Sequence, residues 1–221
     1  MHRVLAAYPL PRRVQSSRWR TGSVQDAVAT CSRVLSSARR QGHGDLAQLR
    51  DQLDQRRQDL RNHVDRLRAG LPEDLVEQAL HEGFTRPNML VLTNVVTGII
   101  GFRGATAFPA WELGRAALDP RTVATSDQWP VCATAMVSAY RSENPALPLA
   151  DVLACFRIAL LYLLFSFSGA TTGEYGLPQE AAVELKRHWQ DRQTTIRRLL
   201  DNFDNLEDVL NTSVPRPWDH R

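Results

Sequence analysis

The chain has 221 residues, of which 43% are hydrophobic and 23% are charged, and its formal net charge is +3 at pH 7. This length suffices for one domain with a substantial core, and no apolar run typical of a secretory signal lies at the N-terminus. The odd, scattered set of Cys31, Cys132 and Cys155 argues against a disulfide framework and predicts buried free thiols in a reducing compartment.

The positive charge is concentrated at the N-terminus, where residues 1–25 contain five arginines and no acidic residue. We expect residues 1–22 to form a flexible arm, because Pro9 and Pro11 oppose a continuous helix. Three roles remain open for it: contact with nucleic-acid phosphates, a mitochondrial presequence, or a solvated tail. The arm is expected to contribute no core residue, so deletion of residues 1–20 should change stability little.

Two amphipathic helices are predicted next, over residues 23–40 and 45–69, with Ser23 and Asp45 as their N-caps. The second has a leucine at every seventh position: Leu46, Leu53, Leu60 and Leu67. The companion seam is interrupted by Arg56 and His63, or by Arg50 and Arg57 in the other frame, so the pattern indicates a narrow packing stripe rather than a leucine zipper.

A short helix is predicted within residues 72–83. Residues 87–108 are rich in β-branched residues and glycine, so they are either a pair of strands or a buried helix followed by a loop. Gly98, Gly101 and Gly104 do not form a phosphate-binding loop, because no Lys-Ser/Thr pair follows them, and close backbone packing is their expected use.

Residues 148–168 are predicted to form the central buried helix, after short helices over 109–118 and 127–140. Between Val152 and Phe167 only Arg157 and Ser166 are polar, so the helix is apolar nearly all round. A membrane span is the alternative, although Asp151 and Arg157 would be costly at membrane depth. Arg157 is expected to meet a carboxylate from another element, or else a phosphate.

A long C-terminal helix is predicted from Pro178 to about Asn211 by heptad spacing. Its apolar seam consists of Leu185, Trp189, Ile196, Leu199, Phe203, Leu206 and Leu210. This seam would pack either inside an all-α helical bundle, residues 23–211, or against another subunit. Residues 212–221 are expected to be an irregular tail.

Familiar catalytic and metal-binding motifs are absent: the sequence has no HExxH, GxSxG, CxxC or Walker motif. The six histidines are dispersed, and the paired acids lie near helix ends, where they suit the helix dipole. These patterns predict a protein that is not an enzyme, with no metal site, cofactor or small-molecule substrate.

Several short motifs occur in a distinctive order. They are Ser16-Ser17-Arg18-Trp19, Cys31-Ser32-Arg33-Val34-Leu35, Phe108-Pro109, Leu118-Asp119-Pro120, Glu143-Asn144-Pro145 before the helix of Arg157, and Phe203 followed by Trp218. This order resembles that of the coat proteins of rod-shaped plant viruses of the tobamovirus kind.

The resemblance implies a viral coat protein, an all-α bundle that self-assembles into helical filaments and packages single-stranded RNA, found in the virion and the host cytoplasm. RNA would be held by arginine–phosphate contacts without a membrane or small-molecule partner. The expected RNA-binding residues are Arg12, Arg13, Arg18, Arg20, Arg39, Arg40, Arg141 and Arg157.

The alternative function is that of a non-viral helical adaptor, which would bind a partner through the C-terminal heptad helix. Such a protein would act in the mitochondrial matrix or the cytoplasm, depending on the role of residues 1–22.

Overall fold

The computed structural model describes residues 1–42, 45–171 and 178–215, so Trp218 and most of the expected tail lie outside the described residues. The helices are α1 (His2–Leu5), α2 (Arg18–Thr21), α3 (Val24–Arg40), α4 (Leu46–Ala69), the 3-10 helix η1 (Arg86–Asn88), α5 (Pro109–Ala117), α6 (Pro120–Thr125), α7 (Trp129–Glu143), α8 (Leu149–Leu153), α9 (Cys155–Phe165) and α10 (Gln179–Ser213). The strands are β1 (Gln78–Leu80), β2 (Met89–Leu92), β3 (Val95–Ile99) and β4 (Ala105–Ala107).

The predicted all-α fold class is wrong, because two small antiparallel sheets lie among the helices. β1 pairs with β4, so the segment expected to be a short helix over 72–83 contains a strand instead. β2 pairs with β3 through a two-residue turn, which settles residues 87–108 as strands rather than helix. Both turn residues, Thr93 and Asn94, have positive φ angles of 50° and 63°, the backbone that a twisted two-residue hairpin requires.

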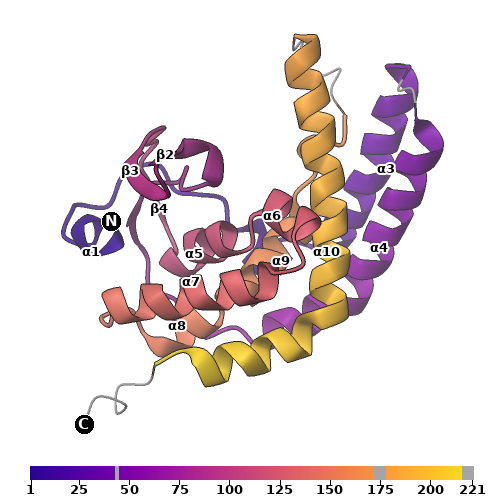
Figure 1. Ribbon diagram of the computed structural model, residues 1–221. Coiled ribbons are helices and arrows are strands. Elements are labelled where there is room, and N and C mark those ends of the chain that lie inside the picture. The colour runs from indigo at the N-terminus through magenta and orange to yellow at the C-terminus, as the bar shows by residue number, and fades with distance from the viewer. Residues whose placement is uncertain (43–44, 172–177, 216–221) are drawn as a thin grey trace.

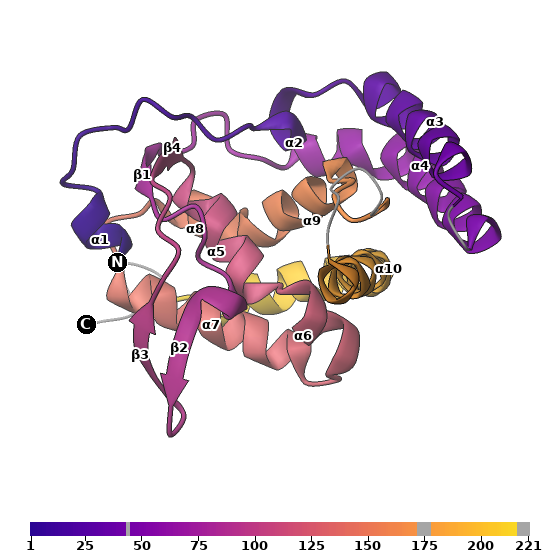
Figure 2. The same ribbon diagram turned by 90° about the horizontal axis from the view of Figure 1, so that it is seen from above.

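The β2–β3 hairpin projects from the body of the molecule (Figure 2). Large apolar side chains are exposed along it: Leu90, Val91, Leu92, Val95, Val96 and Ile99. The segment is therefore held by strand pairing and by its turn, and contributes little to the hydrophobic core.

α3 and α4 form an antiparallel hairpin along one side of the molecule (Figure 1). Ser23 caps α3 by accepting a hydrogen bond from Asp26 N, and Asp45 caps α4 in the same way from Gln48 N. Both caps are as predicted from the sequence.

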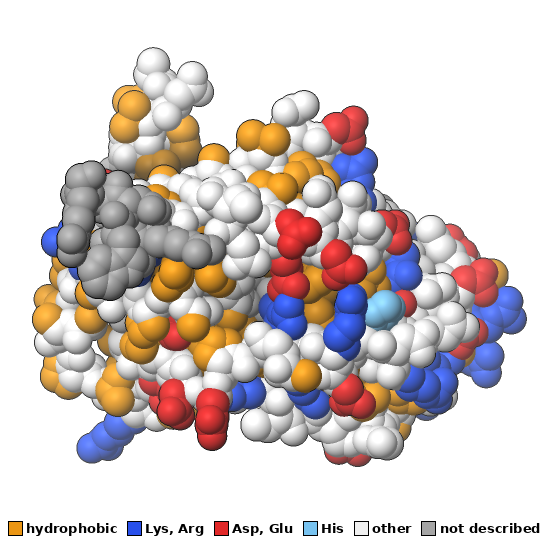
Figure 3. Space-filling view, turned by 90° about the horizontal axis from the view of Figure 1, so that it is seen from below, with side chains coloured by type: hydrophobic (Ala, Val, Ile, Leu, Met, Phe, Trp, Pro, Cys, Tyr) orange, Lys and Arg blue, Asp and Glu red, His pale blue; other side chains and the backbone are white. Residues whose placement is uncertain are grey.

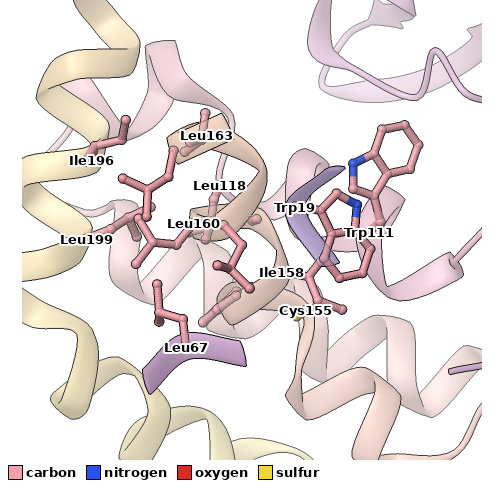
Figure 4. Packing of buried hydrophobic residues seen from close by; sticks show 14 of the residues in the cluster. Trp19, Leu67, Trp111, Leu118, Cys155, Ile158, Leu160, Leu163, Ile196 and Leu199 are labelled. Carbon is pink, nitrogen blue, oxygen red and sulfur yellow. The ribbon is translucent and has the colours of Figure 1, made fainter. Parts of the chain in front are cut away.

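The centre of the core is α9, which packs against α2, α4, α5 and α10. Figure 4 shows Leu160 and Leu163 of α9 beside Ile196 and Leu199 of α10. The predicted single helix over 148–168 is divided at Ala154 into α8 and α9, and it ends at Phe165. No helix in the described part of the chain is long and apolar enough to cross a membrane.

α5 approaches α9 very closely at Gly114. A Cβ atom at this position would lie 2.1 Å from the carbonyl oxygen of Cys155, so only glycine fits between the two helices. Its neighbours on α5, Trp111 and Arg115, both contact the Tyr162 ring of α9. Because Gly114 has no side chain, α5 and α9 pack closely enough for Trp111 and Arg115 to contact Tyr162.

α10 runs the length of the molecule and turns beneath α7 and α8 (Figure 1). Of the predicted seam, six side chains are buried within this chain: Trp189, Ile196, Leu199, Phe203, Leu206 and Leu210. Leu185 is half-buried. The seam therefore belongs to the core of the monomer, where the sequence had left a subunit contact open.

The N-terminal segment contacts the core, and the expectation that it holds no core residue is wrong. Trp19 is only 1% exposed, and its ring meets the edge of the Phe108 ring at 5.6 Å. Arg13 and Gln15 exchange backbone hydrogen bonds with Thr106 at 2.8 and 3.0 Å. An apolar anchor and strand-like pairing thus hold this segment in place.

The thiols differ in accessibility. Cys31 and Cys155 are buried as predicted, whereas Cys132 is exposed, so the prediction is wrong for that residue. Burial raises the pKa values of the Cys31 and Cys155 thiols, which keeps them protonated at neutral pH. A chromogenic thiol reagent should therefore titrate one thiol per folded chain and three in denaturant. Rapid reaction of two or more thiols in the folded protein would contradict this assignment.

Candidate functional site

Two loops meet at the end of the β1–β4 sheet. Because β1 pairs with β4, the loop that follows β1 and the loop that precedes β4 lie side by side. The buried ring of His81 meets the edge of the Phe102 ring at 5.3 Å, and Arg103 N donates to His81 O at 3.2 Å. Gly83 N in turn donates to His81 Nδ1 at 3.1 Å.

Gly83, Asn88 and Gly101 converge where these loops meet. The Asn88 side-chain amide donates to Gly83 O at 2.7 Å, and the backbone oxygen of Asn88 accepts from Ile100 N at 2.9 Å. Gly101 has a φ of +73°, in the left-handed region that glycine adopts at little cost. Asn88 thus contacts both loops, with its side chain bonded to Gly83 and its backbone oxygen bonded to Ile100 N.

Glu82 is the carboxylate of this loop, and it faces the N-terminal segment. It lies 2.8 Å from Arg13, and its side chain is largely buried. Its φ of +64° is unusual for a residue with a side chain. Glu82 therefore couples residues 81–88 to the segment that precedes α2.

A cavity of about 700 Å³ opens beside the first of these loops. Thr85, Arg86 and Pro87 form one wall, and the others come from the ends of α5 and α6, from α9 and from α10. Tyr162 and Leu163 of α9 contribute the apolar wall. A volume of this size suits a small-molecule ligand.

Arg192 of α10 lines the cavity while only 3% exposed. Its guanidinium donates to Ser168 O at 3.1 Å, to Ser168 Oγ at 2.6 Å and to Ser166 Oγ. Among the described residues no carboxylate lies within ion-pair distance of it. Burial lowers the pKa of Arg192, Tyr162 opposes that effect, and the neighbouring positive charge of Arg115 reinforces it.

Arg115 is the second guanidinium of this wall. It stacks on Trp111 and Tyr162, with ring-centroid distances of 4.6 and 5.1 Å, and these contacts hold its plane in place. Arg192 and Arg115 together make the inner part of the cavity positive.

The acids of the cavity are mostly engaged elsewhere. Asp119 caps α6 by accepting from Thr122 N at 3.1 Å, and Glu184 pairs with Arg187 and lies 3.9 Å from Arg121. Asp191 of α10 is half-buried, and this partial burial raises its pKa. Within the described residues, these acidic groups therefore lie nearer to Arg121 than to Arg192, and none of them pairs with Arg192.

The arginines predicted to bind RNA do not form one surface. Arg12, Arg18, Arg39 and Arg40 are exposed, and Arg13 pairs with Glu82. Arg20 donates to Glu73 O and stacks on Phe108, and the buried Arg141 donates to Pro145 O at 2.9 Å. Figure 3 shows acidic and basic side chains intermixed on the face seen from below.

The expected partner of Arg157 is a carboxylate, and that prediction is confirmed. Arg157 Nε donates to Glu207 Oε1 at 2.8 Å, and Glu207 comes from α10, as a partner from another element must. The side chain is 18% exposed, so the pair is half-buried. Arg157 is thus neutralised within the chain.

Sequence reasoning missed the residues of this site. The sequence predicts close packing at Gly98, Gly101 and Gly104, which holds for Gly101. It did not lead us to predict a role for His81 or Asn88. Arg115, Tyr162 and Arg192 come from three helices far apart in sequence, and no local pattern links them. Among the residues the structure describes, no group of three or more His, Cys, Asp or Glu side chains could hold a metal ion.

A sequence model of the phosphotransferase enzyme family matches residues 11–151. The curated proteins gave no significant match, and neither did the solved structures.

The family match overturns the coat-protein hypothesis and its adaptor alternative. The shared order of short motifs was a coincidence of residue types that recur at helix ends, such as Asp-Pro and Phe-Pro. The predictions of no enzyme and no small-molecule substrate are wrong too, because the family is kinase-like and implies small-molecule substrates such as ATP. Because the family model matches more than half of its length, the chain belongs to the phosphotransferase enzyme family.

Proposed function

We propose that this chain binds a small anionic molecule in the cavity beside residues 81–88, as the substrate-holding part of a kinase-like phosphotransferase. The ligand's negative group, a phosphate or a carboxylate, would lie against Arg192 and Arg115. Its remainder would contact Tyr162 and Leu163.

The position of the cavity supports this proposal. Kinase catalytic loops follow the pattern H-R-D-x-x-x-x-N, and His81 and Asn88 have that spacing. Thr85, Arg86 and Pro87 lie between these two residues and line the cavity. A molecule in the cavity would therefore lie next to the loop at which this class of fold works on its substrate.

The observation that carries the proposal is the buried Arg192, for which the described part of the chain supplies no carboxylate partner. A buried charge is expensive unless it is paired, and serine oxygens only partly replace water around a guanidinium. An anion in the cavity would provide the missing negative partner of Arg192, because guanidinium groups bind carboxylate and phosphate through paired hydrogen bonds.

Thermal melts with a panel of small phosphate esters and carboxylates, with inorganic phosphate as the simplest probe, would test this function. A ligand at one hundred times its Kd should stabilise the wild type by about 2.7 kcal/mol. Arg192→Met should remove that stabilisation while it keeps the apolar volume of the side chain. Because Arg192→Met also removes the donor to Ser168 O, its ligand-free stability should fall, so the effect of ligand is measured against the variant's own ligand-free melt.

Arg187→Met is the matched control, since Arg187 is exposed on the same helix and does not line the cavity. It should respond to ligand as the wild type does. If no anion in the panel stabilises the wild type, or if Arg192→Met responds as strongly as Arg187→Met, the cavity does not bind anions in this way.

A further inference from the structure

The kinase pattern assigns its divalent metal ions to side chains that can be located in this chain. The metal ligands are the Asn at the end of the catalytic loop and the Asp of D-F-G, and the base is the Asp of H-R-D. In this chain the two aspartate positions are Gly83 and Gly101, and Gly101 is followed by Phe102 and Arg103. Only Asn88 remains of the oxygen ligands.

The glycines are not simple gaps that carboxylates could fill. A Cβ at Gly83 would lie 2.9 Å from Gly101 O and 3.0 Å from Asn88 Nδ2. A Cβ at Gly101 would lie 3.0 to 3.1 Å from three atoms of the Asn88 amide. The space between the two glycines is therefore already occupied by Asn88.

Asn88 is committed to this position by its hydrogen bonds. Its amide NH₂ donates to Gly83 O at 2.7 Å, and Gly83 O also accepts from Thr85 N at 2.8 Å. The Asn88 side chain thus closes the loop of residues 81–88. Both lone pairs of Gly83 O are engaged in hydrogen bonds, so this oxygen is not available to coordinate an ion.

The remaining donors do not fit a magnesium site. Mg²⁺ requires near-octahedral oxygen ligands at 2.0–2.1 Å, usually including one or two carboxylates. The nearest carboxylate in sequence, Glu82, faces Arg13 at 2.8 Å. The basic side chain of Arg103, in the third position of the D-F-G pattern, adds positive charge to the same segment.

We infer that residues 81–88 and 101–103 hold no divalent metal ion, and that the Asn88 amide closes the loops where the kinase pattern has an ion. Asn88 is a positioning residue here rather than a metal ligand. This inference does not depend on which anion the cavity binds, and phosphoryl transfer routed through a metal at these loops is not supported by the residues present.

Electron paramagnetic resonance of Mn²⁺, used as a probe for Mg²⁺, tests the metal part directly. The chain would be titrated with Mn²⁺ alone and with Mn²⁺ plus ATP, in wild-type form and as Asn88→Ala. We expect the two proteins to leave the same fraction of Mn²⁺ free at every concentration. A saturable site that is present in the wild type and lost in Asn88→Ala would overturn the inference.

Hydrogen exchange tests the positioning role by a separate readout. In Asn88→Ala the amides of Thr85 and Asn88 should exchange about fivefold faster, because one hydrogen bond that closes the loop is lost. Asn62→Ala, an exposed change on α4, is the control and should leave those amides unchanged. Equal protection in Asn88→Ala and Asn62→Ala would show that the amide does not close the loop, whatever the metal titration gives.

A gain-of-site variant complements these measurements. Asn88→Asp introduces a carboxylate and removes the donor to Gly83 O with almost no change in side-chain size. Because the new carboxylate cannot donate to Gly83 O and is free to bind a cation, weak Mn²⁺ binding should appear where the wild type has none. A wild type that already binds Mn²⁺ more tightly than Asn88→Asp would count against the inference.

Discussion

Arg56→Ala should lower the free energy of unfolding by about 3–5 kcal/mol. Arg56 is 1% exposed, and its Nη1 donates to the carbonyl oxygens of Leu163, Leu164 and Ser166 at 2.7, 3.1 and 3.2 Å. These carbonyls belong to the C-terminal end of α9, which has no further helical turn to satisfy them. Truncation would leave the carbonyl oxygens of Leu164 and Ser166 without this donor and Leu163 O with only Ser166 N at 3.3 Å. It would also open a cavity beneath Trp189 and Phe167, on which the guanidinium stacks.

Urea denaturation of Arg56→Ala and Arg57→Ala would measure this difference. Arg57 is the neighbouring residue, but it pairs with Asp54 near the surface, so its removal should cost less than about 1 kcal/mol. Burial lowers the pKa of Arg56 to about 9, which leaves the guanidinium charged at pH 7, as its role at a helix C-terminus requires. Equal unfolding midpoints for the two variants would show that Arg56 does not secure the end of α9.

Trp19→Ala should lower the melting temperature by about 6–20 °C. A buried tryptophan contributes about 3–5 kcal/mol, and each kcal/mol shifts the melting temperature by about 2–4 °C in a chain of this size. Trp19 packs between α9 and Phe108, and Arg68 donates to Trp19 O at 3.0 Å and to Gly22 O at 2.7 Å. Deletion of residues 1–20 should destabilise the fold by at least as much.

Arg12→Ala is the control for this segment, because Arg12 is exposed and should leave the melt within about 1 °C of the wild type. Calorimetry or circular dichroism would measure all three proteins. A deletion of residues 1–20 that melts like the wild type would restore the flexible arm expected from composition.

The local signals in the sequence were reliable where one residue type decides the backbone. Ser23 and Asp45 cap their helices as expected, and the final helix begins directly after Pro178. Such signals act over three or four residues and do not depend on what packs against them.

Arg56 illustrates why the core was harder to predict. Along α4 it looks like a charge that interrupts an apolar seam, and an interrupted seam normally indicates a surface. It is buried because its partners, the last carbonyl groups of α9, lie more than 100 residues further along the chain. No periodicity in α4 contains that information.

The site was missed for a different reason. Motif searches look for the acids that carry the chemistry, and here both acidic positions are glycine. The usable signal was the spacing from His81 to Asn88, followed after an apolar hairpin by Gly101 and Phe102. This spacing can be recognised only by a motif search that allows the two aspartate positions to be glycine. The coat-protein resemblance relied on short motifs, several of which mark helix ends in any helical protein, so their order did not identify the family.

The close contact at Gly114 also sets the dimensions of the cavity. Arg115 follows Gly114 on α5 and stacks on Tyr162 of α9, so the distance between these two helices fixes the width of the cavity wall. Any larger residue at 114 would force the helices apart, since the obstacle is the backbone oxygen of Cys155. The width of the cavity thus depends on a residue that does not line it, so a change in helix spacing would alter which molecules fit without changing a lining side chain.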